Sequence, residues 1–201
     1  MTDDIQSLRD DIAYLKALAS EGQNSGALGG WIMIAAGLSF GVASLVQWAG
    51  LTHSFGVTPL ISNAAWLVSL LVFFAVLFTV KRAQACEGGR STSLAWQGIG
   101  WGLFVLFLAI AIATWKTQSP TIMLFAPSIV LGLYGAAWST AAAISKKAWL
   151  WATAAGSFAA SLISAWLIGD ASEYLFYAAA LVLLAAVPGM VFVAAGRRVA
   201  A

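Results

Sequence analysis

The stretch LGGWIMIAAGLSFGVASLVQWAGLTHSFGVTPLISNAAWLVSLLVFFAVLFTV, residues 28–80, decides the fold of this chain, because it contains no formal charge. The uncharged run begins earlier, at Gly22, and covers 59 residues up to Val80. A helix needs about 20 residues to cross about 30 Å of hydrocarbon, so this run can hold two membrane spans. Two glycines, a proline and polar residues between Gly50 and Pro59 are typical of a turn that separates the spans.

Four shorter uncharged stretches follow along the chain, and each has the length of one span. They contain 25, 29, 22 and 23 residues and lie at 91–115, 117–145, 148–169 and 174–196. The sequence therefore predicts an all-α integral membrane protein with six transmembrane helices. Their expected positions are 28–50, 60–80, 94–115, 120–145, 149–169 and 174–196.

The composition of the 201 residues also indicates that lipid surrounds most of the chain. Apolar residues make up 61% and charged residues 9%, with a mean hydropathy of +0.89. About 25% of the residues of a typical soluble domain are charged, so a soluble fold is excluded. The net charge of +2 is too balanced to indicate nucleic acid as a partner, and the lipid bilayer is the expected surrounding.

Lysine and arginine are distributed unequally between the two ends of the predicted helices. Nine of the ten fall on one side, and only Lys116 falls on the other. The nine are Arg9, Lys16, Lys81, Arg82, Arg90, Lys146, Lys147, Arg197 and Arg198. Since cytoplasmic loops carry the excess of positive charge, we expect a multi-pass protein of the cell (inner or plasma) membrane with both termini in the cytoplasm.

The chain then reads as three successive helical hairpins, each of which ends in a basic pair. The pairs are Lys81–Arg82, Lys146–Lys147 and Arg197–Arg198. Whether the hairpins are a true internal repeat stays open, because any three hairpins that obey the charge rule resemble one another.

The segment before the first span has the pattern of a separate amphipathic helix. Apolar residues recur there at steps of three and four, the spacing of a helical seam. They are Ile5, Leu8, Ile12 and Leu15. We predict a cytoplasmic helix in residues 1–24 that ends by Gly22, followed by the six-span bundle in residues 25–201. The predicted role of the seam is to dock a partner.

The polar side of this helix is acidic. Asp and Glu outnumber Lys and Arg by five to two in residues 1–24, a balance of −3. Helices that lie on anionic lipid are normally rich in Lys and Arg, so a protein surface is the expected partner. Three surfaces remain open: a second copy in a homo-oligomer, a separate cytoplasmic protein, and the basic inner face of the same bundle near Lys81 and Arg82.

Small residues recur on helical faces of the predicted spans, where they let helix backbones approach closely. We expect these residues to pack helices together or, as an alternative, to line a narrow pathway. The positions are Gly37, Gly41, Gly98, Gly102, Ser128, Gly132, Ser139, Ser157 and Ser161. Pro127 and Pro188 lie inside predicted spans, where each should free a backbone carbonyl and kink its helix.

Groups that could carry chemistry are scarce. No ionisable residue lies inside a span by these boundaries, which argues against proton-coupled antiport, ion pumping and voltage sensing. Cys86 and His53 are the only cysteine and histidine, so we expect no metal site and no cofactor. The best catalytic set is His53 with Ser54 or Ser119 and Asp170, all predicted on the outer surface. Nothing in the sequence places these side chains together, so we expect no catalytic residues and no enzyme.

These observations favour a non-catalytic multi-pass membrane protein. The leading hypothesis is a scaffold, an assembly subunit or a membrane-tethered regulator that docks its partner through the N-terminal helix. The alternative is a carrier or channel for a small neutral or apolar solute, which would use the small-residue faces and the proline bends.

Overall fold

The structure, a computed structural model, describes the backbone of residues 2–87 and 93–200. It describes side chains at residue 12 and in the ranges 28–82, 100–119 and 121–196. Within these residues the chain is all-helical, without a strand. Six helical segments are long and apolar enough to cross a membrane, which confirms the all-helical class and the six predicted segments. They are Leu28–Leu51, Pro59–Arg82, Gly100–Thr117, Thr121–Ser145, Ala148–Trp166 and Ser172–Gly196.

The first helix, α1 (Thr2–Leu51), is continuous from the N-terminal segment into the first span. The prediction that a separate helix ends by Gly22 is therefore wrong. A glycine costs a helix only about 1 kcal/mol relative to alanine, and the chain around Gly22 has no proline to interrupt the hydrogen bonds. A helix already formed in the span then continues into the preceding residues at little cost.

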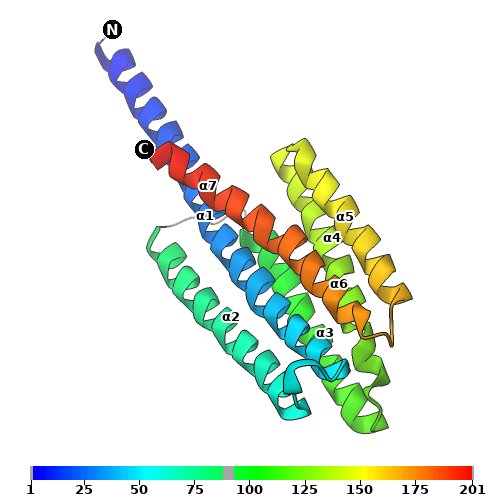
Figure 1. Ribbon diagram of the computed structural model, residues 1–201. Helices are drawn as coiled ribbons and strands as arrows, with labels where there is room; N and C mark the ends of the chain where they lie inside the picture. The colour runs from blue at the N-terminus through cyan, green and yellow to red at the C-terminus, as the bar shows by residue number, and fades with distance from the viewer. Residues whose placement is uncertain (1, 88–92, 201) are drawn as a thin grey trace.

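The N-terminal half of α1 extends beyond the rest of the bundle (Figure 1). At about 1.5 Å per residue, residues 2–27 form a rod of roughly 40 Å that precedes the span starting at Leu28. This straight course is incompatible with the alternative in which the segment folds back onto its own bundle near Lys81 and Arg82.

Five further spans follow α1 and are joined by short turns. The remaining α-helices are α2 (Pro59–Glu87), α3 (Ser93–Thr117), α4 (Ala126–Ser145), α5 (Ala148–Trp166), α6 (Ser172–Leu181) and α7 (Val187–Ala200). Two 3-10 helices, η1 (Ser54–Gly56) and η2 (Pro120–Phe125), precede α2 and α4. A π-helical turn, η3 (Val182–Ala186), joins α6 to α7 within the last span.

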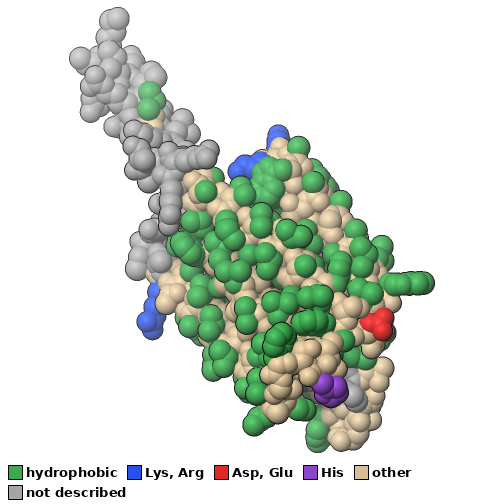
Figure 2. Space-filling model, viewed as in Figure 1, with side chains coloured by type: hydrophobic (Ala, Val, Ile, Leu, Met, Phe, Trp, Pro, Cys, Tyr) green, Lys and Arg blue, Asp and Glu red, His purple; other side chains and the backbone are tan. Residues whose placement is uncertain are grey.

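Both chain termini lie at the same end of the bundle, which also carries the turn between α4 and α5 (Figure 1). The Lys and Arg side chains visible in Figure 2 lie toward that end, whereas the single histidine and an acidic side chain lie toward the opposite end. This separation agrees with the two sides that the charge pattern predicts.

Helix α1 lies at the centre of the packing, because it contacts α2 as well as α6 and α7. Helices α4 and α5 form a second close pair, and α3 touches mainly α4 and η2. The pairs α3–α4 and α5–α6, which the three-hairpin arrangement joins, have less contact than α4–α5 or α1–α6. Contacts between spans that are far apart in sequence are thus a major part of the bundle.

Glycines bring α1 into backbone contact with both η3 and α7. A Cβ atom added to Gly30 would lie 2.6 Å from the carbonyl oxygen of Gly189, and one added to Gly189 would lie 2.7 Å from the carbonyl oxygen of Gly30. At Gly37 an added Cβ would lie 2.7 Å from the backbone nitrogen of Ala186. A Cβ does not fit at these distances, so this crossing requires glycine.

Pro188 frees a backbone carbonyl, as predicted, and a tryptophan from α4 donates a hydrogen bond to it. Pro188 has no N–H group, so the carbonyl oxygen of Leu184 does not receive the usual helical hydrogen bond. The indole Nε1 of Trp138 donates to this oxygen at 2.9 Å. Trp138 is 1% exposed, and its ring stacks on Phe192 with an interplanar angle of 4°. The π-helical turn η3 ends at Ala186, two residues before the proline, where such an irregularity is expected.

The corresponding prediction for Pro127 is wrong. Pro127 lies in the first turn of α4, directly after η2. The first N–H groups of an α-helix have no partner inside the helix, so a proline at this position frees no carbonyl.

Candidate functional site: a buried glutamate between α5 and α6

Glu173, the second residue of α6, is a charged-type side chain in the interior of the bundle. It is fully buried, with 0% of its surface exposed. The charge pattern predicted an outer turn here and a span that starts at residue 174, whereas Glu173 belongs to the candidate span Ser172–Gly196. The statement that no ionisable residue lies inside a span is therefore wrong. The argument against proton-coupled transport rested on that statement and no longer holds.

The turn between α5 and α6 directs this side chain inward. The backbone N–H of Asp170 donates to the carbonyl of Leu167 at 3.0 Å, and the N–H of Glu173 donates to the carbonyl of Asp170 at 3.0 Å. Gly169 has a φ of +93°, a conformation that residues with a Cβ rarely adopt. As a result Asp170 is exposed, while Glu173, three residues later, is buried.

A hydroxyl on α5 and the backbone N–H of Gly169 act on the carboxyl group of Glu173. The hydroxyl of Ser164 on α5 donates to Oε1 at 3.2 Å, and Ser164 is itself 0% exposed. Oε2 has no hydrogen-bond partner. Buried carboxylates normally accept several hydrogen bonds or pair with a cation, and Oε2 of Glu173 does neither.

The helices around Glu173 supply no positive charge. Helix α6 packs against α1 and also touches α5, and the sequence has no Lys or Arg in residues 22–80 or 148–169. Val130 and Leu131 of α4 form an apolar cluster with Tyr177, one turn after Glu173, and α4 has no Lys or Arg within its bounds. No described cation is therefore in place to pair with the carboxylate.

Two effects act in opposite directions on a charged Glu173. The first turn of a helix favours a negative charge by about 0.3–1 kcal/mol. Burial of a carboxylate without a partner costs several kcal/mol even after the surroundings relax. Burial is the larger effect, so the surroundings of Glu173 disfavour the charged form.

The sequence pattern contained one signal that could have located this residue. Glu173, Tyr177 and Leu181 are spaced by four residues, and the latter two are buried, so all three lie on one face of the helix. Glu173 was missed because counting uncharged stretches treats every charged residue as the boundary of a span.

The small residues on α4 and α5 bond the two helices to each other. The hydroxyls of Ser128 and Ser161 each donate to the backbone carbonyl of the other residue, at 2.9 and 2.7 Å. A Cβ added to Gly132 would lie 3.3 Å from the hydroxyl of Ser161. Ser139 and Ser157 donate to carbonyls of their own helices. These four hydroxyls therefore donate their hydrogen bonds to backbone carbonyls within the bundle.

The small residues on α1 and α3 differ in their surroundings. Gly37 and Gly41 face the last span, where a Cβ added to Gly41 would lie 3.7 Å from the carbonyl oxygen of Ala178. Gly102 on α3 is exposed, and a Cβ added there would meet no atom within 4 Å. Its predicted role in packing thus finds no partner among the described residues. The surroundings of Gly98 lie outside the described part of the chain.

Most of the predicted docking seam lies outside the residues whose side chains the structure describes. This applies to Ile5, Leu8 and Leu15. Ile12 is described and is 59% exposed. It belongs to the part of α1 that precedes the first span, so its side chain is free for contact with another molecule.

The catalytic set considered from the sequence does not assemble. Ser54 and Ser119 each share a hydrogen bond with a threonine two residues away. In the part of the chain that the structure describes, no hydrogen bond joins either serine to His53 or Asp170. No group of three His, Cys, Asp or Glu among the described residues could hold a metal ion.

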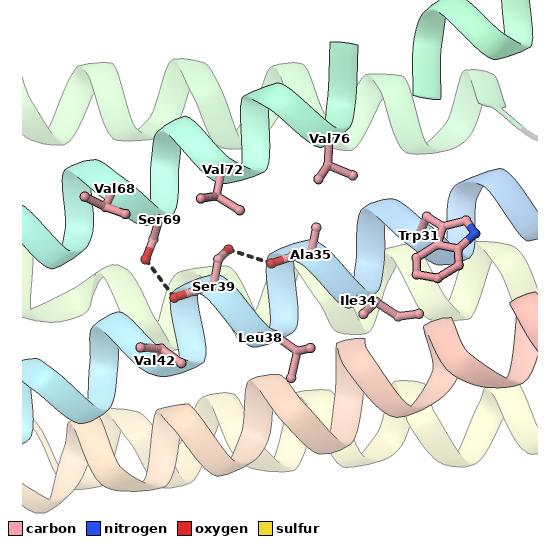
Figure 3. A pocket seen from close by; sticks show the side chains of 10 residues that line it. All are labelled: Trp31, Ile34, Ala35, Leu38, Ser39, Val42, Val68, Ser69, Val72 and Val76. Atoms are coloured by element: carbon pink, nitrogen blue, oxygen red, sulfur yellow. Dashed lines mark hydrogen bonds between the residues drawn. The ribbon is translucent and has the colours of Figure 1, made fainter. Parts of the chain in front are cut away.

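An apolar groove of about 520 Å³ lies between α1 and α2 (Figure 3). Two hydroxyls line it, and both are used: Ser69 donates to the carbonyl of Ser39 at 2.7 Å, and Ser39 donates to the carbonyl of Ala35. Leu38 and Val42 in its wall are exposed, so the groove opens on the outer surface of the bundle. It offers a solute apolar surface and no free hydroxyl.

No protein family, curated protein or solved structure matches this chain.

Proposed function

We propose that this protein is a non-catalytic scaffold or assembly subunit of the cell membrane that docks a separate protein on the seam of α1. The observation that carries the proposal is the continuity of α1, which holds the seam on a rod beyond the bundle. A short isolated helix would be marginal in water, whereas a helix continuous with a buried span presents its apolar stripe in a fixed position. The exposed Ile12 supports this arrangement.

The seam continues the face by which α1 packs against α7. Ile12 and Gly30 are 18 residues apart, which is five full turns at about 3.6 residues per turn, so both positions share one face. Gly30 contacts Gly189, and the two helices run antiparallel, so the end of α7 at Ala200 is level with about residue 19 of α1. The seam positions 5, 8, 12 and 15 therefore lie on this face beyond the end of α7.

This position favours a different protein over a second copy. Two parallel copies of α1 paired through their seams would lie about 8–10 Å apart, and straight helices would keep nearly that distance toward the bundle. There the same face of α1 is covered by α7, which would collide with the second α1. A helix of a separate protein avoids the collision, because it can lie end to end with α7.

The charge of the segment indicates the chemistry of the partner. Residues 1–24 carry a balance of −3, and complementary charges at the edges of a helical seam select the partner helix. The occupant that fits is an amphipathic helix whose apolar stripe is flanked by Lys and Arg. In this proposal the seam faces the cytoplasm and the chain runs as three hairpins, because nine of the ten Lys and Arg lie on the side of the seam.

Site-specific photo-cross-linking in the full-length protein tests the docking proposal. One cross-linker replaces Leu8 on the seam, and a matched control replaces Ala17, which lies on the opposite side of the helix. We expect the seam position to capture a basic amphipathic helix of another protein, and we expect Ile12→Asp to abolish this product. Capture of a second copy of this chain alone, or equal products from both positions, would refute the proposal.

The alternative, a carrier or channel for a small neutral or apolar solute, has less support. Ser128 and Ser161 bond across α4 and α5, and the groove between α1 and α2 opens outward. If Ser128→Ala abolishes the phenotype of the intact gene while deletion of residues 2–22 leaves it unchanged, the carrier gains and docking is wrong.

A further inference from the structure

We infer that Glu173 is a proton-binding site: its carboxyl group holds a proton inside the bundle and exchanges it at the turn between α5 and α6. This inference is independent of the docking seam. It starts from three observations, which are complete burial of the side chain, one hydrogen bond from Ser164, and an Oε2 without a partner.

A proton fits this site better than a metal or alkali cation. Hard cations require several oxygen ligands around them; six to eight is usual for Ca²⁺. At Glu173 the contacts supply one carboxyl group and the hydroxyl of Ser164, both fully buried, and the described residues contain no acidic or histidine cluster. A proton needs no such shell, because it forms a covalent O–H bond with the carboxyl oxygen itself.

The neutral acid also explains the unpartnered oxygen. When Oε1 carries the proton, its O–H can donate to the hydroxyl oxygen of Ser164 across the same 3.2 Å contact. Oε2 is then a neutral carbonyl-type oxygen, for which the loss of a hydrogen bond costs much less than for a carboxylate. These contacts provide too few hydrogen bonds for a charged carboxylate, but they are sufficient for a neutral carboxylic acid.

The titratable groups around Glu173 do not provide compensation. Its own helix adds Tyr174 and Tyr177, the preceding turn adds the acidic Asp170, and Tyr134 of α4 packs against the cluster that contains Tyr177. The segments 28–51 of α1 and 148–166 of α5 add no titratable side chain. Every neighbour that ionises would become negative, so each favours the protonated form of Glu173.

The same turn gives the proton a short route to water. Asp170 and Gly169 are exposed, and the backbone of Glu173 bonds directly to Asp170 at 3.0 Å. A local opening of the turn would therefore bring the carboxyl group to the surface without separating α1 from α7. Proton exchange at Glu173 is thus expected to leave the rest of the bundle folded.

Infrared difference spectroscopy of the whole protein in lipid tests the inference. We expect the spectrum of the natural protein at neutral pH to contain the C=O stretching band of a protonated carboxylic acid, which shifts in deuterated water and is lost in Glu173→Gln. Loss of carboxylate bands instead would overturn the inference. Asp170→Asn is the matched control, and it should leave this band unchanged.

Chemical modification gives a second test, and it uses the natural protein, so it does not depend on whether a substituted protein folds. Dicyclohexylcarbodiimide, a lipid-soluble reagent, reacts with protonated carboxyl groups: the proton moves to a nitrogen of the reagent while the carboxyl oxygen bonds to its central carbon, and the product rearranges to a stable N-acylurea. We expect mass spectrometry to find this adduct on Glu173 and not on the exposed Asp170. An adduct on Asp170 with none on Glu173 would contradict the inference.

Discussion

The indole nitrogen of Trp138 lies 2.9 Å from the carbonyl oxygen of Leu184 and donates to it the hydrogen bond that Pro188 cannot supply. A feature that weakens the last span, the proline, is thus matched by a buried side chain on α4, and the contact joins α4 to the junction of α6 and α7. In lipid no water can satisfy the freed carbonyl, so the partner must come from the protein.

Trp138→Phe should lower the free energy of unfolding by about 1–2 kcal/mol, because it leaves the carbonyl of Leu184 without a donor. Unfolding in detergent measures the change, and Trp151→Phe, at an exposed position, is the control. In a Pro188→Ala background the cost of Trp138→Phe should fall, since the new backbone N–H can take over the bond. Equal costs in both backgrounds would show that the contact does not compensate for the proline.

Gly37→Ala should destabilise the bundle by about 1–3 kcal/mol, because the added Cβ would lie 2.7 Å from the backbone nitrogen of Ala186. Gly102→Ala is the matched control: its Cβ meets no atom within 4 Å, so helix propensity alone predicts a gain of up to about 1 kcal/mol. Thermal unfolding of the two variants gives the comparison. A similar loss at both positions would mean that α1 does not require glycine to approach the last span.

Ser128→Ala and Ser161→Ala should each cost about 0.6 kcal/mol and at most about 2 kcal/mol, the usual range for hydrogen bonds between helices in membranes. The two costs should be similar, because the two bonds are reciprocal. Ser145→Ala, where an exposed hydroxyl bonds within its own helix, should be nearly neutral. Denaturant titration measures all three, and a large loss at Ser145 would contradict this assignment.

Single-cysteine labelling in a Cys86→Ser background tests the proposed orientation. An impermeant thiol reagent added outside intact cells should label Ser54→Cys and Ser172→Cys, whereas Ser145→Cys should react only after the membrane is opened. The expectation follows from the nine-to-one distribution of Lys and Arg. The reverse labelling would place the seam of α1 outside the cell and remove the basis for a cytoplasmic partner.

The helical class and the six long apolar segments could be predicted because charge is costly in lipid, so uncharged stretches of sufficient length indicate segments that are able to cross it. The same rule misplaced Glu173, since a charge next to a span can either face water or turn inward. Which of the two occurs depends on the turn at Gly169, and the composition of the span holds no information about that turn.

Local breakers were harder to interpret than long uncharged stretches. Gly22 does not end α1, because a single glycine costs less than the helix gains by continuing, and Pro127 does not kink α4, because it lies in the first turn. Gly37 and Gly102 look alike in sequence, yet one lies against a backbone and the other is exposed. That difference depends on which helices are neighbours, and the spacing of residues along one helix cannot predict which helices are neighbours.

The contact between Gly30 and Gly189 has a consequence for the order of assembly. The two residues are 159 positions apart, so at about 5–20 residues per second the ribosome needs roughly 8–32 s to make the second after the first. During this time Gly30 has no contact with α7, while the segment of α1 that precedes Gly30 has already been made. A protein that binds this segment therefore has time to do so before the last span arrives and the bundle closes.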